Sequence, residues 1–292
     1  DAQTGVKTLF GDTQLAQELS AKCWFLSSAN SINWGRLLPQ IVYYFSAYCD
    51  FLNSNGLKLG DEVDFAVPTG NFGDILACWY AKQMGLPVGK LICASNENNV
   101  LADFFKTGTY DRNRAFHTTI SPSMDILVSS NLERLLYSVC GDDKQVAEYM
   151  RSLSEKESYT VSKEIFKVLS DNFVGGFCTD ADTKAIIANV YNEHGYLIDT
   201  HTAVAYKLML DHKTDRPTVV VSTASPFKFC DSVLDALGEK TDASGVELIE
   251  KLASFTGNAA PAPLCGLDKR PVRFETVIEK QAMKQAVTEF LK

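Results

Sequence analysis

The sequence is poor in histidine and lacks any motif that would arrange its histidines around a metal. The four histidines are His117, His194, His201 and His212, and none lies in an H-E-x-x-H pattern or a similar ligand spacing. Long apolar runs are missing too, since no stretch approaches the roughly 18 consecutive apolar residues of a membrane span. We therefore expect neither a metal site nor a membrane partner.

Positive charge is in deficit. The chain has 28 Lys and Arg against 36 Asp and Glu, which gives a formal net charge of -8 at pH 7. Proteins that bind nucleic acid usually carry a basic face, so no nucleic-acid partner is expected. A small phosphorylated ligand remains compatible with this charge, because local hydrogen-bond donors bind such a ligand.

None of the eight cysteines shares a C-x-x-C spacing with another, and most lie in apolar runs. A chain of 292 residues with 46% hydrophobic residues can build a core without disulfides. This pattern predicts reduced thiols in a cytoplasmic protein. The chain begins with Asp1 and shows no signal peptide. Its length allows one large α/β domain or two ordinary ones.

The most informative segment is a glycine-containing turn between an expected strand and an expected helix. An apolar, β-branched run at 62–67 precedes Thr69-Gly70-Asn71-Phe72-Gly73-Asp74, and an apolar run of helix length follows at 75–84. Glycines let backbone amides approach a phosphate, and a helix N-terminus adds a partial positive charge. The segment therefore predicts an anion site. The alternative is a plain turn that needs glycine only for its backbone angles.

A second expected strand at 90–94 completes a βαβ unit, which implies a parallel sheet. Polar residues at 96–99 follow this strand, and the strand expected at 218–223 ends in the polar cluster 222–226. Open α/β sheets bind ligands at the carboxyl ends of their strands, so these clusters are expected to lie on one face with the glycine turn.

The remaining segments predict a doubly wound α/β fold, an open, mostly parallel sheet with helices on both faces. Thr179 is expected to cap a helix at 181–191 within a charged, amphipathic block, interpreted as a helical insertion at about 141–195. Further expected elements are helices at 3–10, 13–19, 37–52, 231–237, 246–255 and 274–291, and a short buried strand at 24–26.

Five motifs occur in the order found in threonine synthases of the bacterial and fungal long-chain type, and the chain resembles that family over nearly its whole length. The motifs are Asn-Ser-Ile-Asn-Trp-Gly-Arg at 30–36, Val-Pro-Thr-Gly-Asn-Phe-Gly-Asp at 67–74, Asn-Glu-Asn at 96–98, the pair 121–126 and 129–134, and Ser-Thr-Ala-Ser-Pro-Phe-Lys-Phe at 222–229.

The resemblance implies a pyridoxal-phosphate enzyme of the tryptophan-synthase-β-like fold, fold type II. It implies the conversion of O-phospho-L-homoserine and water to L-threonine and phosphate in threonine biosynthesis. Residues 1–24 would then end a smaller preceding domain, and 25–292 would form the large cofactor-binding domain. The positions that match the family's cofactor-phosphate loop are Gly70, Asn71, Phe72, Gly73 and Asp74.

Thr223 matches the hydroxyl residue that faces the pyridine nitrogen of the cofactor in this family. Such a neutral hydroxyl does not enforce ring protonation as a carboxylate would. Ser31, Asn33 and Arg36 are expected to contact the substrate's phosphate or carboxylate, because guanidinium and helix N-terminal donors suit oxyanions. The alternative is that Arg36 is a solvated helix residue and Ser31 a helix cap. Asn131 and His201 are weaker candidates.

One family motif is missing. Threonine synthases carry their Schiff-base lysine in a motif of the form His-Gly-Pro-Thr-x-Ala-Phe-Lys-Asp, and residues 1–292 contain no such motif. We therefore assign no catalytic residue and expect this chain to be a fragment that is inactive alone. The chain is expected to be a monomer or a homodimer. Two other functions stay open: a threonine or serine dehydratase-like enzyme or cysteine synthase of fold type II, and a non-catalytic protein that binds a phosphate ligand.

Overall fold

The computed structural model describes residues 2–55 and 57–291, and these form two compact units. One unit lies within residues 30–265, and the other joins residues 2–29 to residues 266–291. The boundary expected between residues 24 and 25 stays a prediction. In the described part of the chain, no helix has both the length and the apolarity needed to cross a bilayer.

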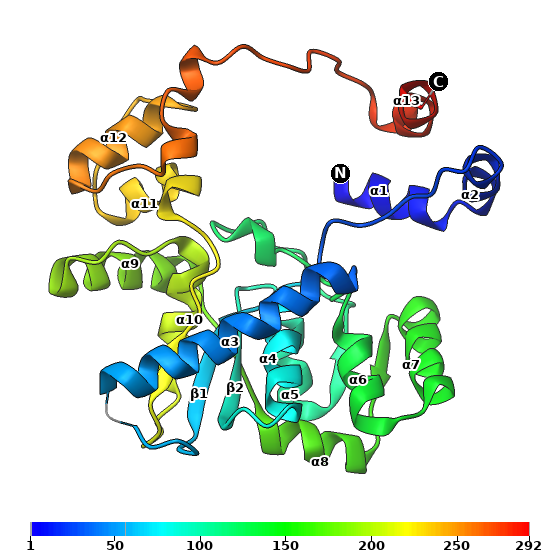
Figure 1. Ribbon diagram of the computed structural model, residues 1–292, viewed down its shortest axis with the longest axis horizontal. Helices are drawn as coiled ribbons and strands as arrows, with labels where there is room; N and C mark the ends of the chain where they lie inside the picture. The colour runs from blue at the N-terminus through cyan, green and yellow to red at the C-terminus, as the bar shows by residue number, and fades with distance from the viewer. Residues whose placement is uncertain (1, 56, 292) are drawn as a thin grey trace. The chain divides into compact units, whose positions relative to one another are not determined.

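The unit of residues 30–265 is built on a four-stranded sheet in the order β5-β2-β1-β6 (Figure 1). All three neighbouring pairs are parallel, and every residue of β1 is buried, as expected for the interior of a parallel sheet. Two short antiparallel strands, β3 and β4, pair elsewhere in this unit. The strands are β1 (Val63–Pro68), β2 (Val88–Ser95), β3 (Thr109–Asp111), β4 (Ser158–Thr160), β5 (Phe173–Phe177) and β6 (Thr218–Val220).

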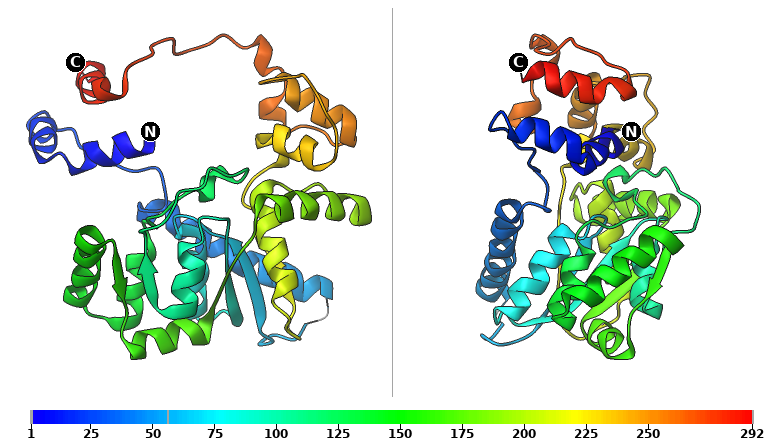
Figure 2. Two further views of the ribbon diagram at one scale, coloured as in Figure 1. Left: turned by 180° about the vertical axis from the view of Figure 1, so that it is seen from behind. Right: turned by 90° about the vertical axis from the view of Figure 1, so that its right-hand side faces the viewer.

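Successive residues of the central strands enter different hydrophobic cores, which shows that helices cover both faces of the sheet. Phe65 and Val67 pack in the larger core with α3, α4 and α5, whereas Ala66 packs with α10. In Figure 1 α3 and α4 lie in front of the strands, and the view from behind in Figure 2 shows α10 beside the sheet. The helices of this unit are α3 (Trp34–Asn55), α4 (Gly73–Gln83), α5 (Val100–Thr107), α6 (Leu132–Cys140), α7 (Asp143–Lys156), α8 (Lys163–Asn172), α9 (Asp180–His194), α10 (Thr200–Asp211), α11 (Cys230–Ala236) and α12 (Glu247–Thr256), with short 3-10 helices at η1 (Pro122–Met124), η2 (Pro226–Lys228) and η3 (Ala262–Leu264).

The segment 141–195 is not entirely helical, so that part of the sequence interpretation is corrected. It contains α7, α8 and α9, and Thr179 caps α9 as expected, but it also supplies β5 to the main sheet. The sequence of β5 hides it, because two of its five residues are glycine. A Cβ on Gly175 would lie 2.7 Å from the Ala102 carbonyl oxygen on α5, and one on Gly176 would overlap Leu208 on α10. The glycines therefore let helices approach β5 closely from both faces.

The strand β6 is shorter than the expected strand 218–223. Only Thr218–Val220 form strand structure, and these residues are half-buried. β6 lies at the edge of the sheet, and among residues 2–55 and 57–291 no strand other than β1 pairs with it to extend the ladder.

The unit formed by the two ends of the chain differs most from expectation. The predicted strand at 24–26 is wrong, because the segment is irregular and the side chains of Trp24 and Phe25 are 51% and 84% exposed. The predicted helix at 274–291 is wrong in its first half, where the chain is irregular up to residue 279. Asp12 caps α2 and forms an ion pair with Lys284 at 2.6 Å, which ties α2 to α13. The elements of this unit are α1 (Ala2–Gly11), α2 (Thr13–Ser20), α13 (Met283–Phe290), η4 (Leu267–Lys269) and η5 (Lys280–Ala282).

Candidate functional site

A cavity of about 230 Å³ lies where the glycine turn connects the carboxyl end of β1 to α4. The predicted residues that line it are Ser31, Gly70, Asn71, Phe72, Gly73, Asp74 and Thr223, so the structure brings these together. The remaining lining residues are Asn30, Gln40, Pro68, Thr69, Ile75, Ser123, Met124, Asn131 and His201.

The two glycines of the turn are required by close packing. A Cβ on Gly70 would lie 2.9 Å from the Ser123 carbonyl oxygen, and a Cβ on Gly73 would lie 2.5 Å from Ser31 Oγ. Neither glycine has a positive φ; the left-handed residue is Phe72, with φ 64°. The alternative of a turn that needs glycine only for its backbone angles therefore does not describe this segment.

The left-handed conformation of Phe72 is held by its buried ring. Such a conformation costs about 1–3 kcal/mol for a non-glycine residue. The Phe72 ring is 1% exposed and packs against Phe105 and Phe173 at centroid distances of 5.9 and 6.1 Å. Burial of an aromatic ring can offset this cost. The aromatic contacts therefore fix the backbone of the turn at the point where α4 begins.

Backbone amides of the turn and of the first turn of α4 have no acceptor in the part of the protein that the structure describes. Among the described residues, none accepts a hydrogen bond from the amides of residues 70–75. The first amides of any helix lack partners within the helix, and here the turn extends the set to six consecutive N–H groups. Six free donors beside the positive end of a helix dipole form a site for an anion.

The carbonyl groups of the turn are tied to the loop before α6. Ser129 Oγ donates to the Gly70 carbonyl at 2.9 Å, and Asn131 Nδ2 donates to the Asn71 carbonyl at 2.6 Å. Ser130 Oγ donates to Asn71 Oδ1 at 3.1 Å. Because the C=O and N–H of a trans peptide point in opposite directions, these bonds turn the amides of Asn71 and Phe72 away from the loop.

Asp74 puts a carboxylate in the cavity wall. Burial raises the pKa of Asp74, and the hydrogen bond from Tyr44 Oη to Asp74 Oδ1, at 3.0 Å, lowers it in part. Burial and the charge of Asp74 raise the pKa of Tyr44 well above its usual value, so the tyrosine is a hydrogen-bond donor. A proton on Asp74 would remove the one negative side chain that lines this cavity.

Ser31 reaches the cavity, whereas two other predicted substrate contacts do not line it. Ser31 Oγ donates to Gln40 Oε1 at 2.8 Å, and the Arg134 guanidinium contacts the Ser31 carbonyl. Asn33 Oδ1 accepts from the Gly35 amide at 2.9 Å at the start of α3. Arg36 is exposed on α3 and lies outside the lining.

The polar cluster after β2 supports a loop and does not line the cavity. Asn96 and Asn98 are buried, and their amide groups donate to Asp125 Oδ1 at 2.8 and 3.1 Å. Thr119 adds two hydrogen bonds to the same carboxylate, from its amide and its hydroxyl. This network fixes the segment that leads into Ser123, which does line the cavity.

Gln40 and Arg134 are cavity-region residues that the sequence reasoning missed, and His201 was only a weaker candidate. Arg134 contacts both Ser31 and Asn131 Oδ1, and it lies within a family motif that could have indicated it. His201 is 3% exposed and accepts a hydrogen bond from the Ser123 amide at 3.2 Å. No local pattern indicates that contact, because its partners are 78 residues apart.

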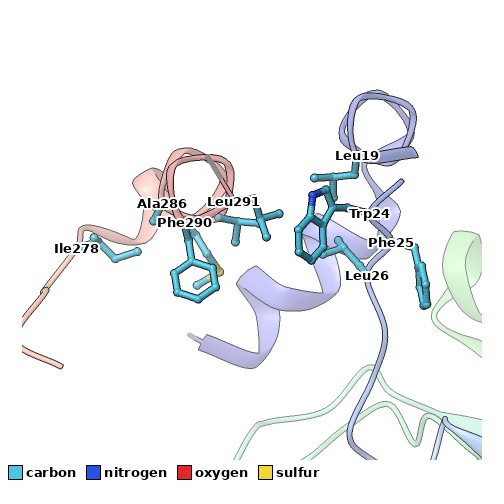
Figure 3. A pocket seen from close by; sticks show the side chains of 10 residues that line it. Leu19, Trp24, Phe25, Leu26, Ile278, Ala286, Phe290 and Leu291 are labelled. Atoms are coloured by element: carbon cyan, nitrogen blue, oxygen red, sulfur yellow. The ribbon is translucent and has the colours of Figure 1, made fainter. Parts of the chain in front are cut away.

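A second cavity, of about 370 Å³, lies in the unit formed by the chain ends (Figure 3). Its lining contains no acidic, basic or nucleophilic side chain, so it offers packing surface and no chemistry. Its lining residues are Leu19, Trp24, Phe25, Leu26, Ile278, Met283, Ala286, Val287, Phe290 and Leu291. Across the described residues there is also no group of three histidine, cysteine, aspartate or glutamate side chains placed to hold a metal ion.

Comparison with known proteins gives consistent matches to threonine synthases. A family model described as "Threonine synthase, C-terminal" matches residues 202–290. The threonine synthase of Saccharomyces cerevisiae is 35% identical over 312 residues, which cover 100% of this chain and 57% of the yeast protein. Threonine synthase-like 1 of Homo sapiens is 45% identical over 240 residues, which cover 80% of this chain and 32% of the human protein.

Solved structures agree with these sequence matches. The crystal structure of threonine synthase from Brucella melitensis, described as bound to pyridoxal phosphate, has a TM-score of 0.80 and 37% identity, and the match covers 98% of this chain and 56% of that one. The yeast enzyme has a TM-score of 0.79 and 32% identity. These structures confirm the predicted fold type II. The chain spans about a third of the human relative and just over half of the yeast enzyme. The chain is thus similar over most of its length to threonine synthases, and residues 202–290 match the C-terminal domain of that family.

Proposed function

We propose that this chain carries the cofactor-phosphate site of a threonine synthase. The observation that carries the proposal is the row of six amides at residues 70–75 that have no acceptor in the described protein. The whole protein would convert O-phospho-L-homoserine and water to L-threonine and phosphate, as a pyridoxal-phosphate-dependent carbon–oxygen lyase.

The residues present fit a phosphate monoester group. Gly70 and Gly73 leave space that any Cβ would fill, and the amides of the turn supply donors without a positive side chain. Thr223 lines the same cavity and would place a neutral hydroxyl near the ring nitrogen. When bound, pyridoxal phosphate supplies an electron sink for bond cleavage at the substrate. The chain's own residues bind its phosphate and orient it.

Ser31 is the proposed substrate contact best supported by the cavity, because its side chain lines the wall beside Gly73. Asn33 and Arg36 remain proposed contacts from the start of α3. All eight cysteines have free thiols, which supports the proposed cytoplasmic location.

The catalytic lysine is proposed to lie outside residues 1–292. Within the described part of the chain no lysine lines the cavity, and the family's lysine motif is missing from the sequence. We therefore expect residues 1–292 alone to bind the cofactor without turnover.

Phosphate release from O-phosphohomoserine by the full-length gene product tests the reaction, with the Gly70→Ala variant as control. We expect release by the unmodified protein and loss of most activity in the variant. Deamination of threonine without phosphate release would favour the dehydratase-like alternative. Phosphate-ligand binding without either reaction would favour the binding-protein alternative.

The lysine proposal needs a separate experiment on the 292-residue chain. The chain is incubated with pyridoxal phosphate, reduced with borohydride and digested for mass spectrometry. A specific lysine adduct together with turnover would overturn the proposal that the lysine lies elsewhere.

A further inference from the structure

The first turn of α10 holds a buried histidine between a carboxylate and a backbone amide. Asp199 and His201 are 1% and 3% exposed. Asp199 Oδ1 lies 3.2 Å from His201 Nδ1 and accepts from the His201 amide at 2.8 Å. On the other side of the ring, His201 Nε2 accepts from the Ser123 amide at 3.2 Å.

These two contacts select one form of the imidazole. A backbone N–H can only donate, so Nε2 must carry its lone pair and no proton. The proton therefore resides on Nδ1, where Asp199 Oδ1 accepts it. A second proton on Nε2 would oppose the Ser123 N–H and break that hydrogen bond, whereas the bond to Asp199 would remain.

The Ser123 backbone forms the wall that closes on the glycine turn. A Cβ on Gly70 would lie 2.9 Å from the Ser123 carbonyl oxygen and 3.1 Å from the Met124 Cα, closer than side chains normally allow. The 3-10 turn Pro122–Met124 thus packs directly on the anion-binding loop. His201 is the side chain that anchors this turn through its amide.

We propose that neutral His201 is a positioning residue that holds the 122–124 turn against the glycine turn, and that protonation of its imidazole releases the turn and weakens anion binding. The inference rests on the proposed phosphate site and adds a dependence on pH to it. His201 acts through Ser123 and the loop, and it does not take the role of an anion ligand.

The charged groups around the imidazole permit this response. Asp199 is the carboxylate in contact with the ring, with its Oδ1 3.2 Å from His201 Nδ1. The Phe229 ring covers another side at a centroid distance of 4.7 Å, and Lys228 lies beyond it, 5.4 Å from that ring. Asp74 is the other titratable group that lines the cavity.

Whether a proton is released or taken up when the anion binds separates this proposal from a purely electrostatic response. A bound anion usually favours protonation of nearby groups, so proton uptake is expected if His201 or Asp74 responds only to charge. If the anion requires the closed turn, binding selects neutral His201 and releases a proton. The direction of proton transfer on binding therefore decides between the two.

Sulfate is the probe for the test, because its charge does not change over the range of about pH 5 to pH 8 in which imidazoles titrate. Sulfate binding to the 292-residue chain is measured by calorimetry in two buffers of different ionisation enthalpy. The variants are His201→Gln, which keeps an uncharged acceptor near the Nε2 position, and His201→Leu, which has none. His194→Gln is the matched control, since His194 is an exposed histidine outside the cavity.

The unmodified chain is expected to bind sulfate roughly fivefold to tenfold more weakly at acid pH, the scale of one lost hydrogen bond, and to release a proton on binding there. His201→Gln is expected to bind sulfate with an affinity that does not fall at acid pH and to release no proton on binding. His201→Leu should bind weakly at every pH, and His194→Gln should match the unmodified chain.

An identical pH profile in His201→Gln and the unmodified chain would overturn the role of His201 and leave the phosphate site standing. Proton uptake that disappears in His201→Gln would also overturn it, because His201 would then act as a direct anion ligand. If neither sulfate nor pyridoxal phosphate binds the unmodified chain at any pH, the phosphate site and the role of His201 are both refuted.

Discussion

Gly73 and Ser31 meet so closely that the two positions can be tested as a pair. A Cβ on Gly73 would overlap the Ser31 side chain, whereas a Cβ on Gly70 would meet the backbone of Ser123 and Met124. Removing the Ser31 side chain can therefore relieve the clash at Gly73, whereas it cannot relieve the clash at Gly70, which involves backbone atoms.

We expect Gly73→Ala to lower the free energy of unfolding by about 1–3 kcal/mol, the usual cost of overpacking, and to weaken sulfate binding. Adding Ser31→Gly should restore part of both, because it removes the atoms that the new methyl group meets. The measurement is a double-mutant cycle by urea unfolding and sulfate titration. Gly70→Ala combined with Ser31→Gly is the control and should show no recovery. Strict additivity in the first pair would contradict the packing argument.

Asp74 provides a second prediction at the scale of one residue. Since burial raises its pKa, the folded chain binds this proton more tightly than the unfolded chain does. Ionised Asp74 therefore lowers stability above its folded pKa, and the penalty disappears as the pH falls through that value. Asp74→Asn is expected to raise stability at neutral pH, to flatten the profile on the acid side and to strengthen sulfate binding.

Asp171 is the control for this measurement, because its pKa is shifted in the direction opposite to that of Asp74. The hydrogen bond from Lys167 lowers the pKa of Asp171, so its contribution is present above the unfolded value and is lost as the pH falls through the folded value. Asp171→Asn should change little, because the pair is exposed. Urea unfolding from about pH 4 to pH 7 compares the two variants. A loss of stability at neutral pH in Asp74→Asn would contradict the sign assigned to Asp74.

At the scale of elements, the loop between α5 and α6 depends on one carboxylate. Asp125 accepts four hydrogen bonds, from Asn96, Asn98 and two donors of Thr119. We expect Asp125→Ala to cost about 1–3 kcal/mol in the free energy of unfolding, because the Thr119 amide loses its acceptor and the buried Asn96 and Asn98 each lose one of theirs. It should also weaken sulfate binding, since the loop carries Ser123 into the cavity wall.

Asp111→Ala is the matched control, because Asp111 Oδ1 accepts from one backbone amide, that of Asn113. Its expected cost is about 1 kcal/mol, with unchanged sulfate binding. Equal losses in the two aspartate variants, measured by urea unfolding, would show that the Asp125 network does not hold the loop.

Local and distant contacts explain why some helices and strands were predicted and others were not. β1, the glycine turn and α4 follow from a local pattern, because an apolar run, two glycines and a helical run are contiguous. β5 was missed, since its Gly175 and Gly176 are explained only by helices that approach from other parts of the chain. The strand predicted at 24–26 fails for a related reason: within the described residues of its own unit there is no strand for it to pair with.

For the whole molecule, the two units are expected to differ strongly in local stability. Among the described residues of the chain-end unit, only Leu15 and Leu19 are buried hydrophobics, whereas three hydrophobic cores lie within residues 30–265. Regions with little buried apolar surface open at low free-energy cost. Hydrogen exchange should therefore be fast in α1, α2 and α13 and slow in β1 and β2. Equal protection of the two units would contradict this expectation.

The sequence by itself indicated the similarity to threonine synthases, the parallel α/β fold and the glycine turn, because each is carried by contiguous residues with a local physical role. It also placed Ser31 and Thr223, through motifs at the ends of other elements. Only the tertiary structure decided which candidates meet. It put Asn131 and His201 in the cavity wall, left Arg36 outside it, and gave Asn96 and Asn98 to a supporting network. Those outcomes depend on contacts between residues far apart in the chain, and packing selects them.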